Sequence, residues 1–514
     1  MVKVKESLWQ IVGVSLILCL LLSPAITSAQ TPQYGGDLKM LTVMMPKLGA
    51  PWEGSFLWGR VGRAVYETLV SSDVNEGIHP WLAESWDIAG DGKSITFHLR
   101  KGIKFHDGTP FNAEAVKYNL DSWKPGTGAS RAMVHVTSVE VVGDYAVKLN
   151  LDQWDSLLLL QFSVGDVVMA SPKATQKSTT PEDMAVVHMV GTGPFKIVDY
   201  KRNSFAKFVK NEDYWKKGRP YVDSVEFRAI ADATVRNMAF EAGDGQFVEP
   251  LQPMEAKALE DKGYLIEESS LGFIMMILPD GANPDSPFAK KKVREAVEYA
   301  IDKEGLYMGL FQKRWPPAYE QALQNDPYYN PDVKPRMYDP EKAKALLDEA
   351  GYPNGFKTVL HVDTRGNRDF QTAVQTYLSE VGIDAELDVA DPGRYTKMSN
   401  TGWDGLLMPG FPNPSNSVYL LNRFGNKPYW PSMYSPPGWW DKWEAMVAQR
   451  DETLRIKQVS QLIKIMADEA MVIPVYETHP TWATNSSKNR AYQVDWCGEK
   501  STNYWDPVGV WISK

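Results

Sequence analysis

Two histidines and an acidic residue lie within ten positions of one another in the stretch 96–120, TFHLRKGIKFHDGTPFNAEAVKYNL. They are His98, His106 and Asp107. Imidazole and carboxylate groups can bind a metal ion or exchange protons with a substrate. A metal site needs several converging ligands, but the chain has seven scattered histidines and no His-Glu-x-x-His motif. We therefore expect no metal here and interpret both histidines as structural contacts.

The residues around these side chains predict a strand, a turn, a second strand and a helix. Alternation places Phe97 and Leu99 on one face of the first strand and His98 on the other. Both histidines then lie on strands, and a turn follows at 107–108. Asn112 is expected to cap the helix that follows. We therefore interpret the stretch as a structural connection between two strands and a helix.

The first thirty residues predict secretion. Lys3 and Lys5 precede an apolar run from 11 to 22, and small residues follow at 27–29. A helix over that run would reach only about 18 Å, short of the roughly 30 Å hydrocarbon core of a membrane. We predict a signal peptide over 1–29 and a periplasmic location.

Composition excludes several classes of partner. The 514-residue chain has 64 acidic and 55 basic residues, a formal net charge of −9 and no basic run. This balance argues against binding of nucleic acid or of an anionic membrane surface. Of the two cysteines, Cys19 lies in the predicted signal peptide, so Cys497 has no internal disulfide partner. We expect no cofactor.

The pattern of elements predicts an α/β fold. Hairpins dominate the first half of the chain, and strand–helix–strand units are expected at 225–248 and 357–389. Such units produce parallel pairing. Further elements are expected as a strand at 36–44, helices at 340–350 and 454–466, and a strand at 472–476, with no regular periodicity after about 478.

The stretch 80–120, PWLAESWDIAGDGKSITFHLRKGIKFHDGTPFNAEAVKYNL, resembles the signature of the family 5 solute-binding proteins of ABC importers. These are peptide and nickel receptors, the cluster C periplasmic binding proteins. The resemblance continues, in order along the chain, through GTGPFKIVDY (191–200), NEDYWKKGRPYVDSVEFRAI (211–230), VREAVEYAID (293–302) and YDPEKAKALLDEAGYPNGF (338–356).

The resemblance implies a type II-like periplasmic binding protein fold with two lobes joined by a hinge. Lobe I would cover 30–267, with an extra subdomain at about 70–185, and would be completed by the return segment 478–514. Lobe II would cover 268–477. The implied partners are a small-molecule ligand and the permease subunits of an ABC transporter, and we expect a monomer.

The resemblance also suggests ligand contacts. In dipeptide-binding relatives an arginine grips the ligand carboxylate, and Arg365 in DTRGNRDF (363–370) matches it across a shortened loop. An aspartate that receives the α-ammonium of the peptide is replaced by Gly410, and no acid occurs between Asp404 and Asp441. An ammonium buried without a partner would be costly. An ordinary free dipeptide is therefore disfavoured, and an anionic or aromatic small solute is favoured.

Other candidate ligand residues have structural alternatives. Arg131 falls near a carboxylate-binding arginine of nickel-binding relatives, although a surface salt bridge explains it equally well. Aromatic side chains could stack on a ring or could simply pack in the core, and two asparagines could bind the ligand or stabilise turns. These candidates are Trp52, Trp58, Phe411, Trp496, Asn413 and Asn416.

The rival class is a secreted hydrolase. The chain has no Gly-x-Ser-x-Gly motif, and its Ser204-x-x-Lys207 pair lies on a predicted hairpin strand, where the two side chains face opposite sides. We expect no enzyme and no catalytic residue. Receptors of the same family for oligopeptides, oligosaccharides or metal chelates remain open alternatives, as does a role in sensing without import.

Overall fold

The fold is taken from a computed structural model of the chain. It describes residues 32–44, 48, 51–53, 60–73, 76–123, 131–163, 167–175, 189–269, 272–409, 413–414, 424, 430–485, 508–510 and 512. The predicted signal peptide lies outside the described residues.

A mixed seven-stranded sheet contains the first predicted strand–helix–strand unit. In spatial order its strands are β10 (Phe195–Lys201), β11 (Phe205–Lys210), β12 (Ser224–Ala229), β1 (Asp37–Thr42), β13 (Phe247–Val248), β21 (Thr481–Thr484) and β14 (Leu265–Glu268). Strand β1 pairs in parallel with β12 on one side and with β13 on the other. Helix α7 (Ala233–Ala242) connects β12 to β13, and Asp232 caps it. Both the unit and the strand predicted at 36–44 are confirmed.

A six-stranded sheet contains the second unit. Its strands are β17 (Ile383–Ala390), β16 (Phe356–Asp363), β18 (Leu406–Met408), β15 (Phe273–Pro279) and β19 (Asn413–Pro414), with β20 (Ile473–Thr478) also paired to β15. Strand β16 runs parallel to β17 and to β18, and helix α12 (Arg368–Glu380) connects β16 to β17. The predicted parallel pairing is confirmed.

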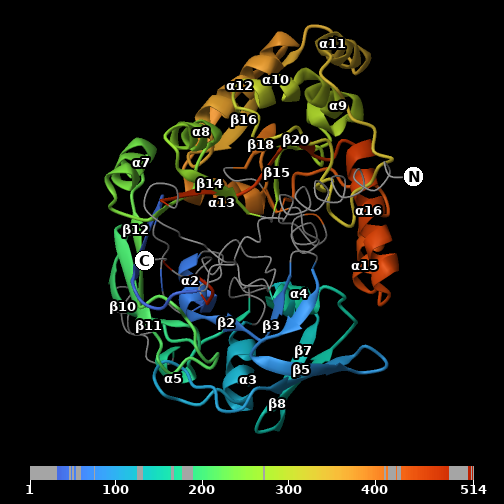
Figure 1. The fold of residues 1–514 in the computed structure, drawn as a ribbon. Helices are drawn as coiled ribbons and strands as arrows, with labels where there is room; N and C mark the ends of the chain where they lie inside the picture. The colour runs from blue at the N-terminus through green and yellow to red at the C-terminus, as the bar shows by residue number, and fades with distance from the viewer. Residues whose placement is uncertain are drawn as a thin grey trace, which may run out of the picture. The chain divides into compact units, whose positions relative to one another are not determined.

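Helices cover both faces of this sheet, as the apolar run FIMMILP of β15 requires. Met275 and Ile277 pack in one cluster with residues of α9 (Lys291–Ala300), α11 (Pro340–Glu349) and α12. Met276 and Leu278 pack in another with residues of α15 (Trp439–Val447) and α16 (Glu452–Asp468). Figure 1 shows α9, α11 and α12 gathered beside β16.

Within the described ranges, the chain crosses between the two sheets at two places. One crossing joins β14 to β15, and the other joins β20 to β21. The backbone N–H of Ser269 donates to the carbonyl of Pro480 at 2.9 Å, and His479 Nδ1 lies 2.8 Å from the carbonyl oxygen of Ser269. The two crossings are therefore hydrogen-bonded to each other. Strand β21 was missed from the sequence because all four of its residues are buried, which leaves no alternation to read.

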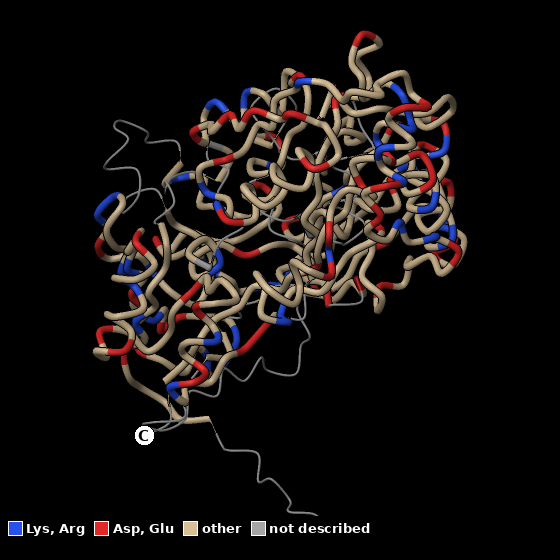
Figure 2. The backbone as a smooth tube through the Cα atoms, turned by 90° about the horizontal axis from the view of Figure 1, so that it is seen from above, with Lys and Arg blue, Asp and Glu red and all other residues tan. Residues whose placement is uncertain are grey.

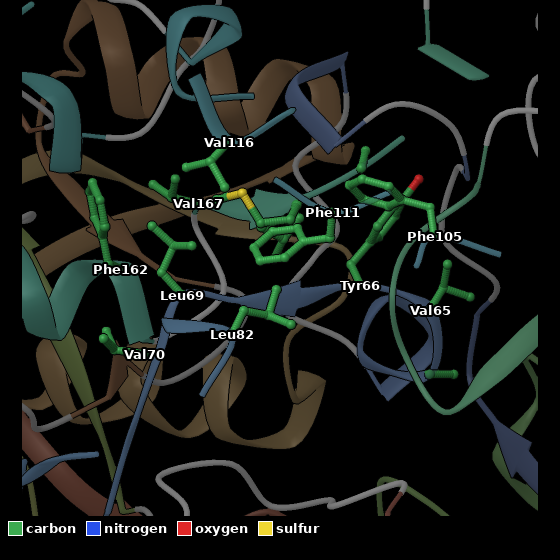
Figure 3. Packing of buried hydrophobic residues seen from close by; sticks show 14 of the residues in the cluster. Val65, Tyr66, Leu69, Val70, Leu82, Phe105, Phe111, Val116, Phe162 and Val167 are labelled. Atoms are coloured by element: carbon green, nitrogen blue, oxygen red, sulfur yellow. The ribbon is translucent and has the colours of Figure 1, made fainter. Parts of the chain in front are cut away.

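Smaller sheets occupy residues 67–169. They are the four-stranded sheet β5 (Ala83–Ile88), β6 (Ser94–Leu99), β8 (Ala146–Leu151), β7 (Val136–Gly143), and the pairs β2 (Glu67–Thr68) with β9 (Val168–Met169) and β3 (Val70–Ser72) with β4 (Ile78–Pro80). Asn112 Oδ1 accepts from Ala115 N and caps α3 (Ala113–Ser122), as predicted. Figure 3 shows Val116 of α3 in the apolar core with Phe111, Leu82 and Phe162.

Short helices complete the described chain. They are η1 (Pro51–Glu53), α2 (Arg60–Val65), η2 (Arg131–Met133), α4 (Leu158–Ser163), α5 (Pro172–Thr175), α8 (Pro253–Asp261), η3 (Pro287–Ala289), α10 (Lys303–Met308) and α13 (Pro392–Thr401). None of the helices in the described ranges has both the length and the apolar character needed to cross a bilayer. Figure 2 shows acidic and basic residues interspersed over the described backbone.

Candidate functional site

A hydrogen bond joins the carboxyl ends of the two sets of parallel strands. Asn367 follows β16, Gln252 follows β13, and Asn367 Nδ2 donates to Gln252 Oε1 at 3.1 Å. In sheets of this kind, ligands bind beyond the carboxyl ends of the parallel strands, where the loops leave the sheet. The loops 249–252 and 364–367 therefore form a candidate site shared by both sheets.

Both residues of this contact begin helices. Asn367 Oδ1 accepts from Phe370 N at 2.9 Å and caps α12. Gln252 is the N-cap of α8, and its backbone N–H donates to Glu255 Oε2 at 3.0 Å. Two helix N-termini thus approach each other at the candidate site, and each carries a partial positive charge.

A buried arginine holds the loops on the side of the seven-stranded sheet. Arg236 of α7 is 3% exposed. Its guanidinium donates to the carbonyls of Ile230 at 3.2 Å and Pro250 at 3.1 Å, and it lies 3.8 Å from Glu255. Arg236 therefore fixes the two loops that follow β12 and β13, and with them the position of Gln252.

Arg365 lies in the same loop as Asn367 and folds back onto the end of β16. Its Nε donates to both carboxylate oxygens of Asp363, at 2.9 and 3.0 Å, and its Nη2 also pairs with that carboxylate. Its backbone N–H donates to Asp363 Oδ1 at 2.8 Å. Asp363 is fully buried, whereas the Arg365 side chain is 32% exposed. The charge of Arg365 is therefore already balanced inside the protein.

Only some of the other predicted ligand residues lie in the part of the chain that the structure describes. Trp52 lies edge-on to Tyr118 and to Trp123, with ring centroids 6.0 and 6.2 Å apart. The backbone of Asn413 pairs with Ile274, and Arg131 begins η2. Trp58, Phe411, Asn416 and Trp496 lie outside the described residues.

The two histidines of the first stretch serve separate contacts. His98 Nε2 lies 2.7 Å from Asp87 on the neighbouring strand. His106 lies in a turn, so its prediction as a strand residue is wrong. The pairing near it is a single bridge between Lys104 and Pro110, because the turns at 102 and 108 leave no room for a longer ladder.

His106 is held neutral by its surroundings. Its Nε2 donates to the carbonyl of Gly193 at 2.9 Å, and burial lowers its pKa to about 4. Within the described ranges, no group of three or more histidine, cysteine or acidic side chains is arranged to hold a metal ion.

The sequence interpretation did not assign roles to Asp363, Asn367 or Gln252. Asn367 carried a detectable signal, because an asparagine before a helix is a typical N-cap. Gln252 carried one as well, since Gln-Pro followed by Glu255 is typical of a helix start. No local pattern shows that these two caps meet, since they are far apart along the chain.

Comparison with known proteins identifies the family. The family model described as bacterial extracellular solute-binding proteins, family 5 middle, matches residues 77–431. The chain is 35% identical over 395 residues to the glutathione-binding protein GsiB of Escherichia coli O1:K1, covering 71% of this chain and 76% of the relative. It is also 35% identical over 344 residues to GsiB of Pectobacterium atrosepticum, covering 65% of each chain.

A solved structure shares the fold. The ABC transporter-associated periplasmic binding protein DppA of Helicobacter pylori, in complex with the peptide STSA, superimposes with a TM-score of 0.79. The match covers 94% of this chain and 99% of DppA at 23% identity. The predicted α/β fold of the periplasmic binding proteins is confirmed. The chain belongs to family 5 of the bacterial extracellular solute-binding proteins, the substrate-binding components of ABC importers.

Proposed function

We propose that the chain captures a small anionic solute beyond the carboxyl ends of its two sheets and delivers it to an ABC importer. The hydrogen bond between Gln252 and Asn367 carries this proposal, because it brings loops of both sheets to one place. A ligand held there contacts both sheets at once. Contacts from both sides are what make ligand binding favour a closed arrangement.

The two sheets are the cores of two lobes in this proposal. Lobe I covers 30–267, including the extra subdomain at about 70–185, and 478–514. Lobe II covers 268–477. The hydrogen bond between Ser269 and Pro480 supports the assignment of the two crossings as the hinge, because it ties both connections together.

Glutathione is the first candidate ligand. Two relatives at 35% identity are named glutathione-binding proteins. Glutathione carries two carboxylates and one α-ammonium, so it is anionic overall. Its γ-peptide bond places that ammonium beside a carboxylate of the same residue and off the peptide backbone, so it does not occupy the position of a dipeptide ammonium. The replacement of the dipeptide-binding aspartate by Gly410 therefore disfavours a dipeptide without disfavouring glutathione.

Arg365 is the proposed carboxylate contact. Its Nε and Nη2 face Asp363, and a guanidinium has a second edge that can engage another carboxylate. Asp363 then fixes the orientation of that edge. The proposed site also includes Arg131, Trp52, Trp58, Phe411, Asn413, Asn416 and Trp496.

The proposal includes location and mode of action. The chain works in the periplasm as a monomer, engages permease subunits, and releases its ligand chemically unchanged. Glutathione recovered after incubation should therefore be intact by mass spectrometry, and turnover abolished by one substitution would instead support the hydrolase.

Titration calorimetry and thermal unfolding test the ligand. Reduced glutathione should bind and should raise the unfolding temperature, since a ligand at 100 times its Kd stabilises a protein by about 2.7 kcal/mol. Alanylalanine and an oligosaccharide serve as controls and should bind far more weakly. Tighter binding of the dipeptide than of glutathione would overturn the ligand assignment.

A further inference from the structure

A second group of contacts joins the two lobes of the proposed function, and it involves neither the crossings nor the candidate site. Glu76, between β3 and β4, reaches residues that follow α10 and lie in α16. Tyr328 donates its hydroxyl hydrogen to Glu76 Oε1 at 3.2 Å. Arg455 Nη1 lies 4.0 Å from Glu76 Oε2. We call Glu76, Tyr328 and Arg455 the clasp.

The clasp is withdrawn from water. The side chains of Arg455 and Glu76 are 9% and 6% exposed, and Tyr328 is 2% exposed. Burial and the nearby charge of Glu76 hold the pKa of Tyr328 well above its ordinary value, so its hydroxyl stays a donor. An ion pair in such surroundings is screened much less than one on the surface.

The backbone at Glu76 is unusual for its residue type. Its φ is +65°, a conformation that glutamate rarely adopts. The turn is closed by hydrogen bonds from Glu76 N to the carbonyl of Asp73 and from Asp73 N to the carbonyl of Gly77. A glutamate held in this conformation, with its carboxylate aimed at the other lobe, suggests a functional constraint.

Apolar and backbone contacts surround the clasp. Leu157 and Leu160 of the first part of the chain pack in the same cluster as Tyr328, Met446 and Val447. The backbone N–H of Ser156 donates to the carbonyl of Val447 at 2.9 Å. These contacts join the same two parts of the chain as the clasp, and separation of the lobes would expose them.

We propose that the clasp of Glu76, Tyr328 and Arg455 holds the two lobes together independently of the ligand and so sets the affinity for the solute without touching it. This inference rests on the proposed two-lobe function. A binding protein whose competent state is only partly populated binds with an affinity reduced by that fraction. The clasp raises that fraction.

Removal of one partner of the ion pair should separate the lobes and weaken ligand binding more than removal of both partners. Glu76→Gln leaves the Arg455 charge buried in the closed state without its partner from the other lobe, and opening restores its hydration. Replacement of both ionic partners by neutral residues removes this penalty. A larger effect in the single variant than in the double variant therefore distinguishes an ionic clasp from simple packing.

The test compares E76Q, the double variant E76Q/R455M and E452Q in the full chain. E452Q is a matched control, because Glu452 Oε1 also lies near Arg455, at 3.9 Å, but belongs to the same helix and is 73% exposed. Small-angle scattering of ligand-free protein reports lobe separation. Calorimetry with reduced glutathione as the probe reports affinity.

E76Q should enlarge the radius of gyration of the ligand-free protein and weaken glutathione binding by about tenfold. The double variant should return to within about twofold of the wild type, and E452Q should change neither measurement. Tyr328→Phe, a smaller change, should move both measurements in the direction of E76Q.

An unchanged scattering profile for E76Q and Y328F, or an equal effect of E452Q, would overturn the clasp. If the wild-type protein and every variant fail to bind glutathione, the proposed ligand is wrong, and scattering alone then tests the clasp. Enlargement in E76Q with recovery in the double variant supports the clasp in that case as well.

Discussion

The side-chain amide of Asn367 makes two contacts in opposite directions. Its oxygen accepts from Phe370 N and caps α12, and its nitrogen donates to Gln252 Oε1, 115 positions earlier in the chain, at 3.1 Å. One residue thus starts a helix of the six-stranded sheet and ties it to a helix start of the seven-stranded sheet. Helix capping and the approach of the two sheets are therefore coupled.

Substitution of Asn367 should separate these two contacts. Serine can still cap the helix but is too short to reach Gln252, so N367S should unfold at nearly the wild-type urea concentration while binding glutathione more weakly. N367A loses both contacts and should also lose about 1 kcal/mol of unfolding free energy. Equal glutathione affinity of N367S and wild type would remove Asn367 from the site.

Arg365→Ala should affect both stability and binding. The variant leaves the buried carboxylate of Asp363 without its charged partner, which we expect to lower the unfolding free energy by about 3 kcal/mol in urea titrations. Arg365→Lys is the control, because it keeps the charge but not the planar fork. It should retain most of the stability and still bind glutathione more weakly. Wild-type affinity in the alanine variant would show that Arg365 is not the carboxylate contact.

His106 should make the fold less stable in mild acid. Its pKa is lowered from 6.5 to about 4, so between these values the unfolded chain takes up a proton that the folded chain does not. Stability is then complete above pH 6.5 and falls as the pH drops towards 4, by at most about 3 kcal/mol. H106Q, whose amide can donate to Gly193, should make the urea midpoint of unfolding nearly independent of pH across this range. A pH dependence equal to that of the wild type would contradict the assignment.

Glu477 should have the opposite pH dependence. Burial, and then the charge of Asp326, raise its pKa from 4.5 to about 7. The folded chain keeps a proton that the unfolded chain loses, so stability falls as the pH rises from 4.5 through 7. E477Q should be more stable than wild type by about 1 kcal/mol at pH 8, after allowance for solvent screening, and equal to it near pH 4.5. Glu341 is exposed, so E341Q provides the control. A gain in unfolding free energy of the same size in E341Q would contradict the explanation.

Local elements were well predicted wherever a periodic pattern met a capping residue. The helix predicted at 340–350 is α11, with Asp339 as its cap, and the second strand–helix–strand unit is β16–α12–β17. Such features depend on neighbours within a few positions. Strand β21 was not predicted because all of its residues are buried, and the turn at His106 was not predicted because it lies between two closely spaced turns at 102 and 108.

The candidate site was only partly predictable. The loop DTRGNRDF was selected from the sequence, but Arg365 was expected to face a ligand, and its pairing with Asp363 two residues away was not foreseen. A side chain's rotamer depends on every group around it, and sequence spacing does not specify those groups. The clasp at Glu76 gave no local signal either.

The sequence by itself determined the family, many of the strands and helices and the net negative charge, because motifs, periodicity and charge are properties of short stretches or of composition. The tertiary structure alone decided which loops meet. Gln252 reaches Asn367, and Glu76 reaches Tyr328 and Arg455, only when the two parts of the chain pack together in the folded protein. Contacts between residues so distant along the chain depend on the packing of whole sheets, which no local pattern encodes.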